Sequence, residues 1–201
     1  MTTTSFTRTL LSAAVLAAFA TGAFAETWNT ATTIGSGQTK TVTDGRIDIE
    51  NPGQPNATVN VNLKGGQLFI SDVNGDAYIT GRVDVVGADA ALKGKDDQTP
   101  IRNLTTGALR LTNGASVELT GNLTGESQKA YYVTVDSTST LKTGGDITGN
   151  FSIVKNDNVL QAGSINVDGY FETSTSGVTT HDGVDAHGQQ CQQQRQSAFH
   201  P

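Results

Sequence analysis

The side chains best suited to metal binding or nucleophilic chemistry lie together at the C-terminal end of the chain. His181, His187, Cys191 and His200 are all of its histidines and its only cysteine. Imidazole and thiolate groups bind zinc when they are closely spaced in pairs, and the spacing of these residues matches no such pattern. The segment is rich in glutamine and poor in apolar residues, a composition typical of disorder. We therefore expect residues 179–201 to be a disordered tail without a metal or catalytic site.

A change of reading frame offers another explanation for this tail. Six of the twelve glutamines of the chain lie in it. A CAA codon for glutamine becomes AAC, for asparagine, when it is read one base later. Permissible codons for HGQQCQQQRQ then give Thr-Gly-Asn-Asn-Ala-Asn-Asn-Asn-Gly-Lys, which is the composition of the preceding segments. We hold as a hypothesis that residues 179–201 are frameshifted, and a gene that uses CAG throughout would contradict it.

Alternating carboxylate and amide side chains suggest a calcium loop in the middle of the chain. Asp72, Asn74 and Asp76 are spaced like the first ligands of an EF-hand. Ala77 and Val83 stand where that loop requires glycine and glutamate, so the pattern fails. We interpret residues 73–76 as a turn between strands.

The adjacent carboxylates Asp96 and Asp97 are the other candidate for chemistry. A polysaccharide-acting enzyme would gather them with Asp84 and Asp89 in one acidic groove, but lysines and Pro100 flank the pair, as in a solvated loop. No histidine or cysteine precedes residue 181, so general-base and nucleophilic catalysis near neutral pH lack their usual groups. The sequence predicts no enzyme and no cofactor, with a small secreted polysaccharide-acting enzyme as the alternative.

Short strands must position these residues, because apolar side chains recur at every second position. The residues between them are mostly Asn, Asp, Arg, Glu, Ser or Thr, as in RIDI, VNVNL, LRL and VEL. Such alternation is typical of strands that bury one face, and it predicts an all-β fold. The alternating pairs and triplets are Ile47 and Ile49; Val59, Val61 and Leu63; Leu68 and Ile70; Val83 and Val85; Leu109 and Leu111; Val117 and Leu119; Val133 and Val135; Phe151 and Ile153; Ile165 and Val167.

Glycine and asparagine separate the strands, as in KGG, VNGD, TNG and TGGDITGN. These residues accept the positive φ of tight turns. Short strands with such turns favour a β-solenoid with coils of about 20 to 25 residues. Weak repeats agree: SVELTGNLTG from Ser116 resembles STLKTGGDITG from Ser139, and NGDAYITGRVDV from Asn74 resembles NGASVELTGNLTG from Asn113. A β-sandwich, with longer strands and clearer hairpins, is the alternative.

The N-terminal residues have the pattern of an export signal. Arg8 is the only charge before Glu26, Leu10–Ala20 is an apolar run, and the Ala-Phe-Ala ending at Ala25 is a small-x-small cleavage pattern. The run is shorter than the ~20 residues that span a bilayer. We predict a signal peptide over residues 1–25, cleavage between Ala25 and Glu26, export through the inner membrane and no membrane span in the mature chain. Residues 26–178 are the predicted β-domain.

The charge of the chain bears on which partners it could bind, and its cysteine content on whether disulfides could stabilise it. The chain has 13 Lys and Arg against 19 Asp and Glu, a net charge of −6 at pH 7. Nucleic-acid binding needs a basic surface, so we expect no nucleic-acid partner. One cysteine cannot form an intrachain disulfide, so something other than disulfides must hold this exported protein together.

The export signal, the Thr-rich segment ETWNTATTIGSGQTKTVTDGRIDI and the Gly/Asn/Thr-rich strands resemble the start of a bacterial autotransporter passenger over residues 1–178. The resemblance implies a right-handed parallel β-helix, often adhesive, that a C-terminal barrel carries across the outer membrane, with host or surface glycans or proteins as partners. No segment after Thr180 has the alternating strands of about ten residues that a barrel needs. We expect the chain as written in the periplasm and an intact parent at the cell surface. The sequence thus predicts a truncated adhesin-like passenger, with the polysaccharide-acting enzyme or a non-functional gene fragment as alternatives.

Overall fold

The computed structural model describes residues 25–28, 30–49, 60–126, 132–167, 169–173, 177–180 and 183–186. Throughout these residues the elements are strands and none is a helix. The prediction of an all-β fold is therefore confirmed. Within the same ranges, no helical segment is long and apolar enough to cross a membrane.

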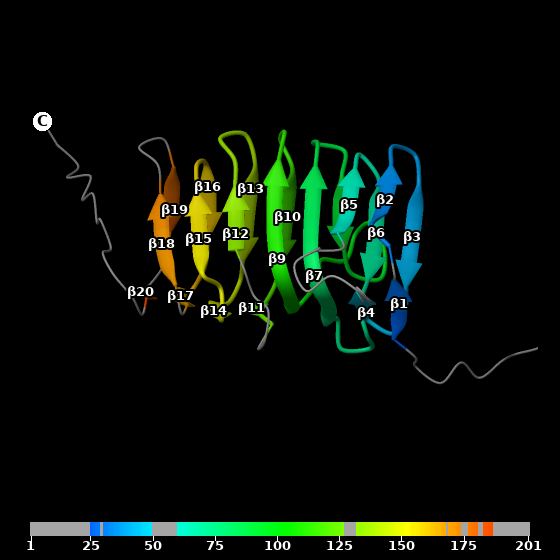
Figure 1. The fold of residues 1–201 in the computed structure, drawn as a ribbon, viewed down its shortest axis with the longest axis horizontal. Helices are drawn as coiled ribbons and strands as arrows, with labels where there is room; N and C mark the ends of the chain where they lie inside the picture. Colours follow the sequence, from blue (N-terminus) through cyan, green and yellow to red (C-terminus); the bar gives the residue numbers. More distant parts are fainter. Residues whose placement is uncertain are drawn as a thin grey trace, which may run out of the picture.

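The described strands form three sheets (Figure 1). A 13-stranded sheet holds β1 (Glu26–Trp28), β2 (Thr32–Gly35), β4 (Arg46–Ile49), β5 (Asn60–Lys64), β7 (Ala77–Val86), β9 (Leu104–Thr112), β11 (Leu123–Gly125), β12 (Tyr132–Val135), β14 (Ile147–Gly149), β15 (Ile153–Asn156), β17 (Ser164–Val167), β18 (Tyr170–Thr173) and β20 (Gly183–Ala186). A 3-stranded sheet holds β3 (Thr39–Val42), β6 (Gln67–Ile70) and β8 (Ala91–Lys93). A 4-stranded sheet holds β10 (Ser116–Leu119), β13 (Thr140–Thr143), β16 (Val159–Gln161) and β19 (Val178–Thr180).

All ladders between these strands are parallel, whereas a β-sandwich is built from antiparallel sheets. The strands repeat in a fixed order along the chain. After β11, β12 and β13 come β14, β15 and β16, and each of these pairs with the strand three places before it: β14 with β11, β15 with β12 and β16 with β13. We call three such consecutive strands a layer. Leu104, Leu123, Ile147 and Ile165 form one column, in which neighbours are 18 to 24 residues apart in the chain. Successive layers follow one another along the longest axis (Figure 1).

Two strands are longer than the short strands that the sequence predicts. β7 and β9 have 10 and 9 residues, because each continues through the position where other layers turn between two strands. A register shift lies between Ile79 and Arg82, and Gly81 takes a φ of 133° that glycine adopts readily. The Thr106 hydroxyl donates to the Gly81 carbonyl at 2.9 Å and holds the two strands together at this irregularity.

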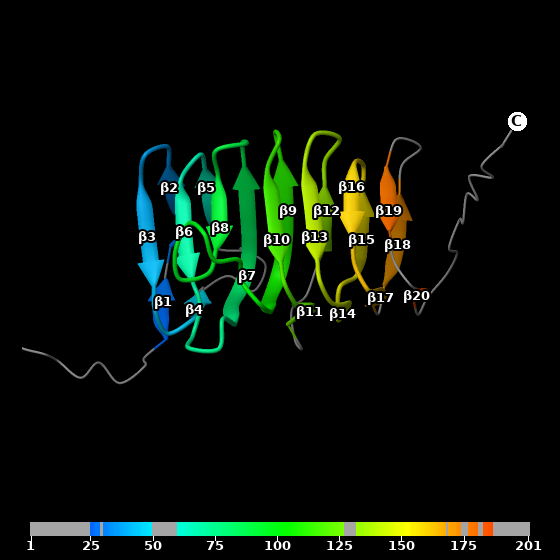
Figure 2. The same ribbon diagram turned by 180° about the vertical axis from the view of Figure 1, so that it is seen from behind.

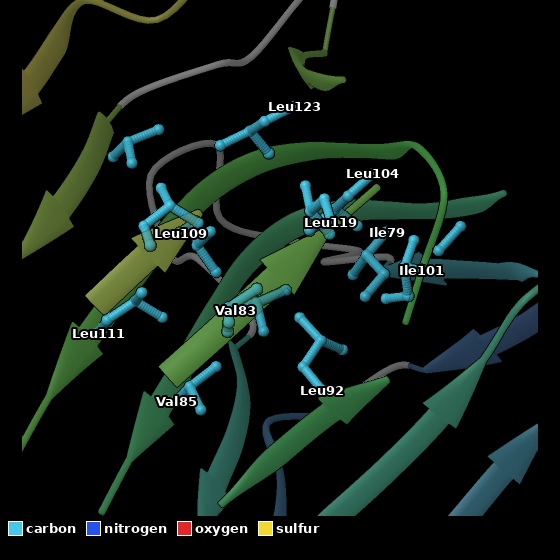
Figure 3. Packing of buried hydrophobic residues seen from close by; sticks show 14 of the residues in the cluster. Ile79, Val83, Val85, Leu92, Ile101, Leu104, Leu109, Leu111, Leu119 and Leu123 are labelled. Atoms are coloured by element: carbon cyan, nitrogen blue, oxygen red, sulfur yellow. The ribbon is translucent and has the colours of Figure 1, made fainter. Parts of the chain in front are cut away.

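The inward positions of the strands form one apolar core (Figure 3). The register aligns Val83, Leu109, Val133 and Val154 in one column, and each is fully buried. Burying such an aliphatic side chain contributes about 1.5–3 kcal/mol to the free energy of unfolding. Most of the alternating residues expected from the sequence lie in this core, and Ile49 packs partly buried against it. Val59 lies outside the described residues.

One predicted alternation is wrong at β15. Phe151 is buried but precedes the strand, and Ile153 is only half-buried. Val154 and Asn156 take the inward positions instead. The Asn156 amide is accommodated because its Nδ2 donates to the Thr179 hydroxyl at 2.9 Å and its Oδ1 accepts the Asn158 N–H at 3.0 Å.

Side-chain oxygens connect the turns that precede β7, β9, β11, β14 and β17. Asp76 Oδ1 accepts a hydrogen bond from Asn103 Nδ2 at 2.9 Å. Asn103 Oδ1 then accepts the Asn122 N–H, and Asn122 Oδ1 accepts the Asp146 N–H, both at 2.8 Å. Asp146 Oδ1 accepts the Ser164 N–H at 2.8 Å. We call these five residues the corner ladder, because each side chain ties one layer to the next.

The sequence predicts positive φ at the turn glycines, but the corner ladder gives several of them another reason. Positive φ accounts for Gly75, with φ of 86°, but Gly121, Gly145 and Gly163 are not among the residues with positive φ. A Cβ on Gly145 would lie 2.1 Å from Asn122 Oδ1. These glycines are needed because the side chain of the neighbouring layer occupies the space of a Cβ.

Hydrogen bonds also fix the turn around Asp136, between β12 and β13. Its Oδ2 accepts the Asn113 N–H at 2.8 Å and its Oδ1 accepts the Thr138 N–H at 2.9 Å. Burial alone would raise the pKa of the Asp136 carboxyl, but these bonds outweigh it and lower the pKa to about 2.

An ion pair closes the core at the β1 end of the stack. Glu26 pairs in register with Ile47, and Lys40 with Leu68, so both charged residues hold positions that are buried and apolar in the next layer. Lys40 Nζ lies 2.6 Å from Glu26 Oε1 and 6.0 Å from the Trp28 ring centroid. The terminal layer thus covers the core with polar groups, as end repeats of stacked proteins require.

The predicted start of the β-domain coincides with the first described strand, but its predicted end does not coincide with the last one. The proposed signal peptide lies outside the described residues except for Ala25, and β1 begins at Glu26. At the other end, residues 183–186 were assigned to the tail but form β20, which pairs with β17. The strands therefore extend beyond residue 178, because GVDA continues the register of SINV. The rest of the predicted tail after Ala186 lies outside the described residues.

Candidate functional site

The EF-hand-like segment forms a turn, as interpreted from its sequence. Asp72 Oδ1 accepts the N–H groups of Asn74 and Asp76 at 2.8 and 2.9 Å, and the Gly75 N–H donates to the Asp72 carbonyl at 3.1 Å. The Asp76 carboxylate receives two hydrogen bonds from Arg102, at 2.8 and 2.7 Å. Arg102 lowers the pKa of Asp76, which is committed to this bidentate pair and to the corner ladder.

The four carboxylates that a polysaccharide-acting enzyme would need are not gathered in one place. Asp84 lies in β7 of the large sheet, and Asp89 lies in the turn before β8. Asp96 and Asp97 follow β8 in a loop, where Asp96 Oδ1 accepts the Gln98 N–H at 3.1 Å. Of the four, Asp89 alone is part of the groove described below.

Asp84 is a buried carboxylate between two arginines. Its side chain is 2% exposed; Arg110 Nη2 lies 2.9 Å from Oδ2 and Arg82 Nε lies 3.1 Å from Oδ1. The second contact is an ion pair without good hydrogen-bond geometry, because both atoms lack an aligned partner. Arg82 Nη1 also donates to the Tyr132 hydroxyl at 3.1 Å. The cluster ties β7 to β9 and β12, and its two arginines against one carboxylate leave it with a net positive charge.

A groove lies on the opposite side of the molecule, where β8 and β10 are neighbours (Figure 2). Its cavity volume is about 600 Å³. It is lined by Gln67, Ala88, Asp89, Ala90, Ala91, Leu92, Lys93, Gln98, Pro100, Ser116 and Glu118. The walls therefore come from β6, from β8 with the segments around it, and from β10.

The groove coincides with an interruption of the strand pairing. β8 belongs to the 3-stranded sheet and β10 to the 4-stranded sheet, with no ladder between them in this part of the chain. On this side of the molecule, the bridge between Ile101 and Leu119 joins the two layers at one end of the groove, whereas the β7–β9 ladder joins them in the large sheet. The groove thus opens where two adjacent layers stop pairing on this side of the molecule.

An inserted loop lies at the interruption. The chain leaves β8 at Lys93 and returns to the core at Ile101, and Figure 3 shows both Leu92 and Ile101 pointing into the core. Gly94 N–H donates to the Thr99 carbonyl at 2.8 Å, and Lys93 Nζ donates to the Asp97 carbonyl, so the loop is closed on itself. This is the charged, proline-bounded stretch LKGKDDQTP that the sequence suggested was a loop.

Sequence reasoning missed the groove, although the chain carries an indication of it. Ala77 pairs with Leu104, 27 residues later, whereas Leu104 pairs with Leu123 after 19 residues. The extra residues fall in the segment between β8 and Ile101. An irregular repeat length could therefore have located the inserted loop, but not the gap beside it.

Potential metal ligands do not converge in the described ranges, where no group of three or more His, Cys, Asp or Glu could hold a metal ion. His181, His187, Cys191 and His200 lie outside those ranges. The chain matches no protein-family model, no curated protein and no solved structure in the comparisons made.

Proposed function

We propose that this chain is an exported, adhesin-like binding scaffold, a β-solenoid of the kind found in autotransporter passengers. The observation that carries the proposal is the repeated parallel register, in which β11 to β13, β14 to β16 and β17 to β19 pair layer on layer in the same order of strands. Strands that pair in this way lie about 4.8 Å apart, so outward side chains recur at a fixed spacing along the stack. Such a surface suits many simultaneous contacts with another surface.

A solenoid accounts for the order of the strands more simply than a set of separate sheets. β11, β12 and β13 form one coil, and the next two coils are β14 to β16 and β17 to β19. Connections between parallel strands are right-handed in nearly all proteins, so the proposed solenoid is right-handed. Thr and charged residues stand at many of its outward positions, among them Glu118, Thr124 and Lys142.

Two outward rows illustrate the surface that we propose to be adhesive. Thr105, Thr124 and Thr148 pair in one row. In another, Thr134 pairs with Arg110 on one side and with Lys155 on the other. Hydroxyl and charged groups in rows can each make a weak hydrogen bond or ion pair, and several together give avidity. Host or surface glycans and proteins are the proposed partners.

Binding of the purified chain to a panel of cell surfaces, extracellular matrix proteins and glycans tests this function. Saturable binding to one class of surface is expected, with a reduced apparent affinity at high salt if outward charges contribute. Absence of saturable binding to every member of the panel would contradict the proposal and favour a non-functional gene fragment. Export is tested separately, by N-terminal sequencing of the chain recovered from the periplasm, which should begin at Glu26.

A further inference from the structure

We propose that the groove between β8 and β10 binds a neutral oligosaccharide. This inference rests on the proposed function and gives it a site and a class of ligand. The groove is separate from the outward rows of the large sheet, and among the described strands of the β3–β19 side it is the place where neighbouring layers are not joined by a ladder.

The side chains of the groove offer hydrogen-bonding groups of both kinds. Asp89 and Glu118 stand on opposite walls and are exposed, so their carboxylates can each accept hydrogen bonds from two hydroxyls. The amides of Gln67 and Gln98 and the hydroxyl of Ser116 can both donate and accept. Sugar hydroxyls need this mixture, because every hydroxyl both donates and accepts.

Backbone groups of β10 also face the groove. The Thr120 N–H donates to the Ile101 carbonyl at 3.0 Å, toward the layer of β8. Backbone groups of successive residues in a strand point to alternate sides, so the N–H and C=O of Ser116 and Glu118 point the same way as those of Thr120. On the other side of β10, the Leu119 carbonyl accepts the Gly144 N–H at 2.9 Å, which agrees with this alternation.

The opposite wall presents its backbone in the same manner. The Ala91 N–H donates to the Gly66 carbonyl at 3.0 Å, so the backbone of Ala91 faces β6. The backbone of Leu92 must then face β10, across the groove. Fixed N–H and C=O groups from both walls supply rigid, preorganised partners for a ligand, which lose no side-chain entropy when it binds.

The shape and charge of the groove select against two other ligands. An inserted peptide strand would need about 4.8 Å on each side, but the Ile101–Leu119 bridge brings the two walls to a single strand spacing at one end. The facing carboxylates of Asp89 and Glu118 would repel a sialylated or sulfated glycan, and the Lys93 ammonium is already directed to the Asp97 carbonyl.

Isothermal titration of the purified full chain with neutral oligosaccharides selected on a glycan array tests the site, with the sialylated forms and an extended peptide library as comparisons. The test variant combines Asp89→Asn and Glu118→Gln, which keep the shape of the side chains. Glu172→Gln, an exposed carboxylate on β18 of the large sheet, is the matched control. Thermal unfolding by circular dichroism checks that all three proteins fold alike.

The wild-type chain and the control are expected to bind the same neutral oligosaccharide, and the double variant to bind it at least about tenfold more weakly, as loss of hydrogen bonds to charged groups predicts. Equal binding by the double variant, or preference for sialylated glycans or peptides, would overturn the inference. Surface binding without any saccharide binding would overturn the groove site but leave the proposed function standing. Saccharide binding without surface binding would support the groove site and overturn the proposed adhesive function. Absence of both kinds of binding would overturn the groove site and the proposed function.

Discussion

Replacing Gly145 by alanine should destabilise the protein through a clash with one side chain of the neighbouring layer. The new Cβ would lie 2.1 Å from Asn122 Oδ1 and 3.1 Å from the Gly121 carbonyl carbon. The first distance is far too short for any contact, so the Asn122 amide must move and release the Asp146 N–H that it binds at 2.8 Å. The lost hydrogen bond costs about 0.5–1.5 kcal/mol, and the overpacking costs about 1–3 kcal/mol. We expect a loss of about 2–4 kcal/mol in the free energy of unfolding.

A double-mutant cycle with Asn122→Ala separates this clash from a general intolerance of side chains at Gly145. Asn122→Ala alone should cost about 1 kcal/mol, because the hydrogen bond that it removes is solvent-exposed. In that background the space at Gly145 is free of the amide, and Gly145→Ala also restricts the unfolded chain, which stabilises by about 0.4–1 kcal/mol. The second substitution should then be nearly neutral, which gives a coupling energy of about 2 kcal/mol or more.

Urea unfolding followed by far-ultraviolet circular dichroism measures all four corners of the cycle. Gly163→Ala provides a graded comparison, because its Cβ would lie 2.8 Å from Asp146 Oδ1 and should cost less than Gly145→Ala. Additive effects of Gly145→Ala and Asn122→Ala, within about 0.5 kcal/mol, would refute the corner-ladder explanation. A stabilising effect of Gly145→Ala alone would refute the described backbone of this turn.

Three further predictions concern pH, packing and the end of the stack. Because folding depresses the Asp136 pKa from 3.8 to about 2, its contribution is present above pH ~4 and is lost as pH falls to about 2. After discounting for its partial exposure to solvent, this amounts to about 1 kcal/mol, which Asp136→Asn should remove from the pH dependence of urea unfolding. Leu109→Ala, at a fully buried position, should cost about 2–5 kcal/mol in the same assay, and a cost below about 1 kcal/mol would argue against the described register. Replacing both Glu26 and Lys40 by leucine should expose an apolar end and produce concentration-dependent oligomers in light scattering, whereas a variant that stays monomeric would show that the ion pair does not protect this end.

Local pattern was enough to predict which side chains face the core but not which residues meet between layers. Val83, Val85, Leu109 and Leu111 alternate with polar residues, and each is buried as that alternation predicts. At β15 the pattern misled, because Phe151 is buried from outside the strand and shifts the apparent period by one residue. Alternating apolar residues therefore predict the buried face of a strand correctly only where all of them lie within that strand.

The two internal resemblances show the same limit. The repeat that pairs the segments from Ser116 and Ser139 is reflected in the structure, where Val117 pairs with Leu141 and Leu123 with Ile147. The resemblance between the segments from Asn74 and Asn113 is wrong as a register. Tyr78 and Ile79 lie in the large sheet, whereas the corresponding Glu118 and Leu119 lie in the 4-stranded sheet. Similar strand-and-turn composition on different sheets cannot be distinguished without knowledge of the neighbouring layer.

The corner ladder and the groove together suggest how this fold could tolerate variation. The turn backbones stay bonded through the layer that carries the inserted loop: the Arg102 N–H donates to the Gly75 carbonyl at 2.7 Å, and the Gly121 N–H donates to the Arg102 carbonyl at 2.7 Å. The loop after β8 therefore interrupts one side of the stack while the corner beside it continues without a break. Since the corner fixes the register, residues 94–100 can change in length and chemistry without moving the layers above and below them. The same separation places two of the residues that line the proposed groove, Gln98 and Pro100, on the segment whose sequence is least constrained by packing, where a new specificity could arise at the smallest cost in stability.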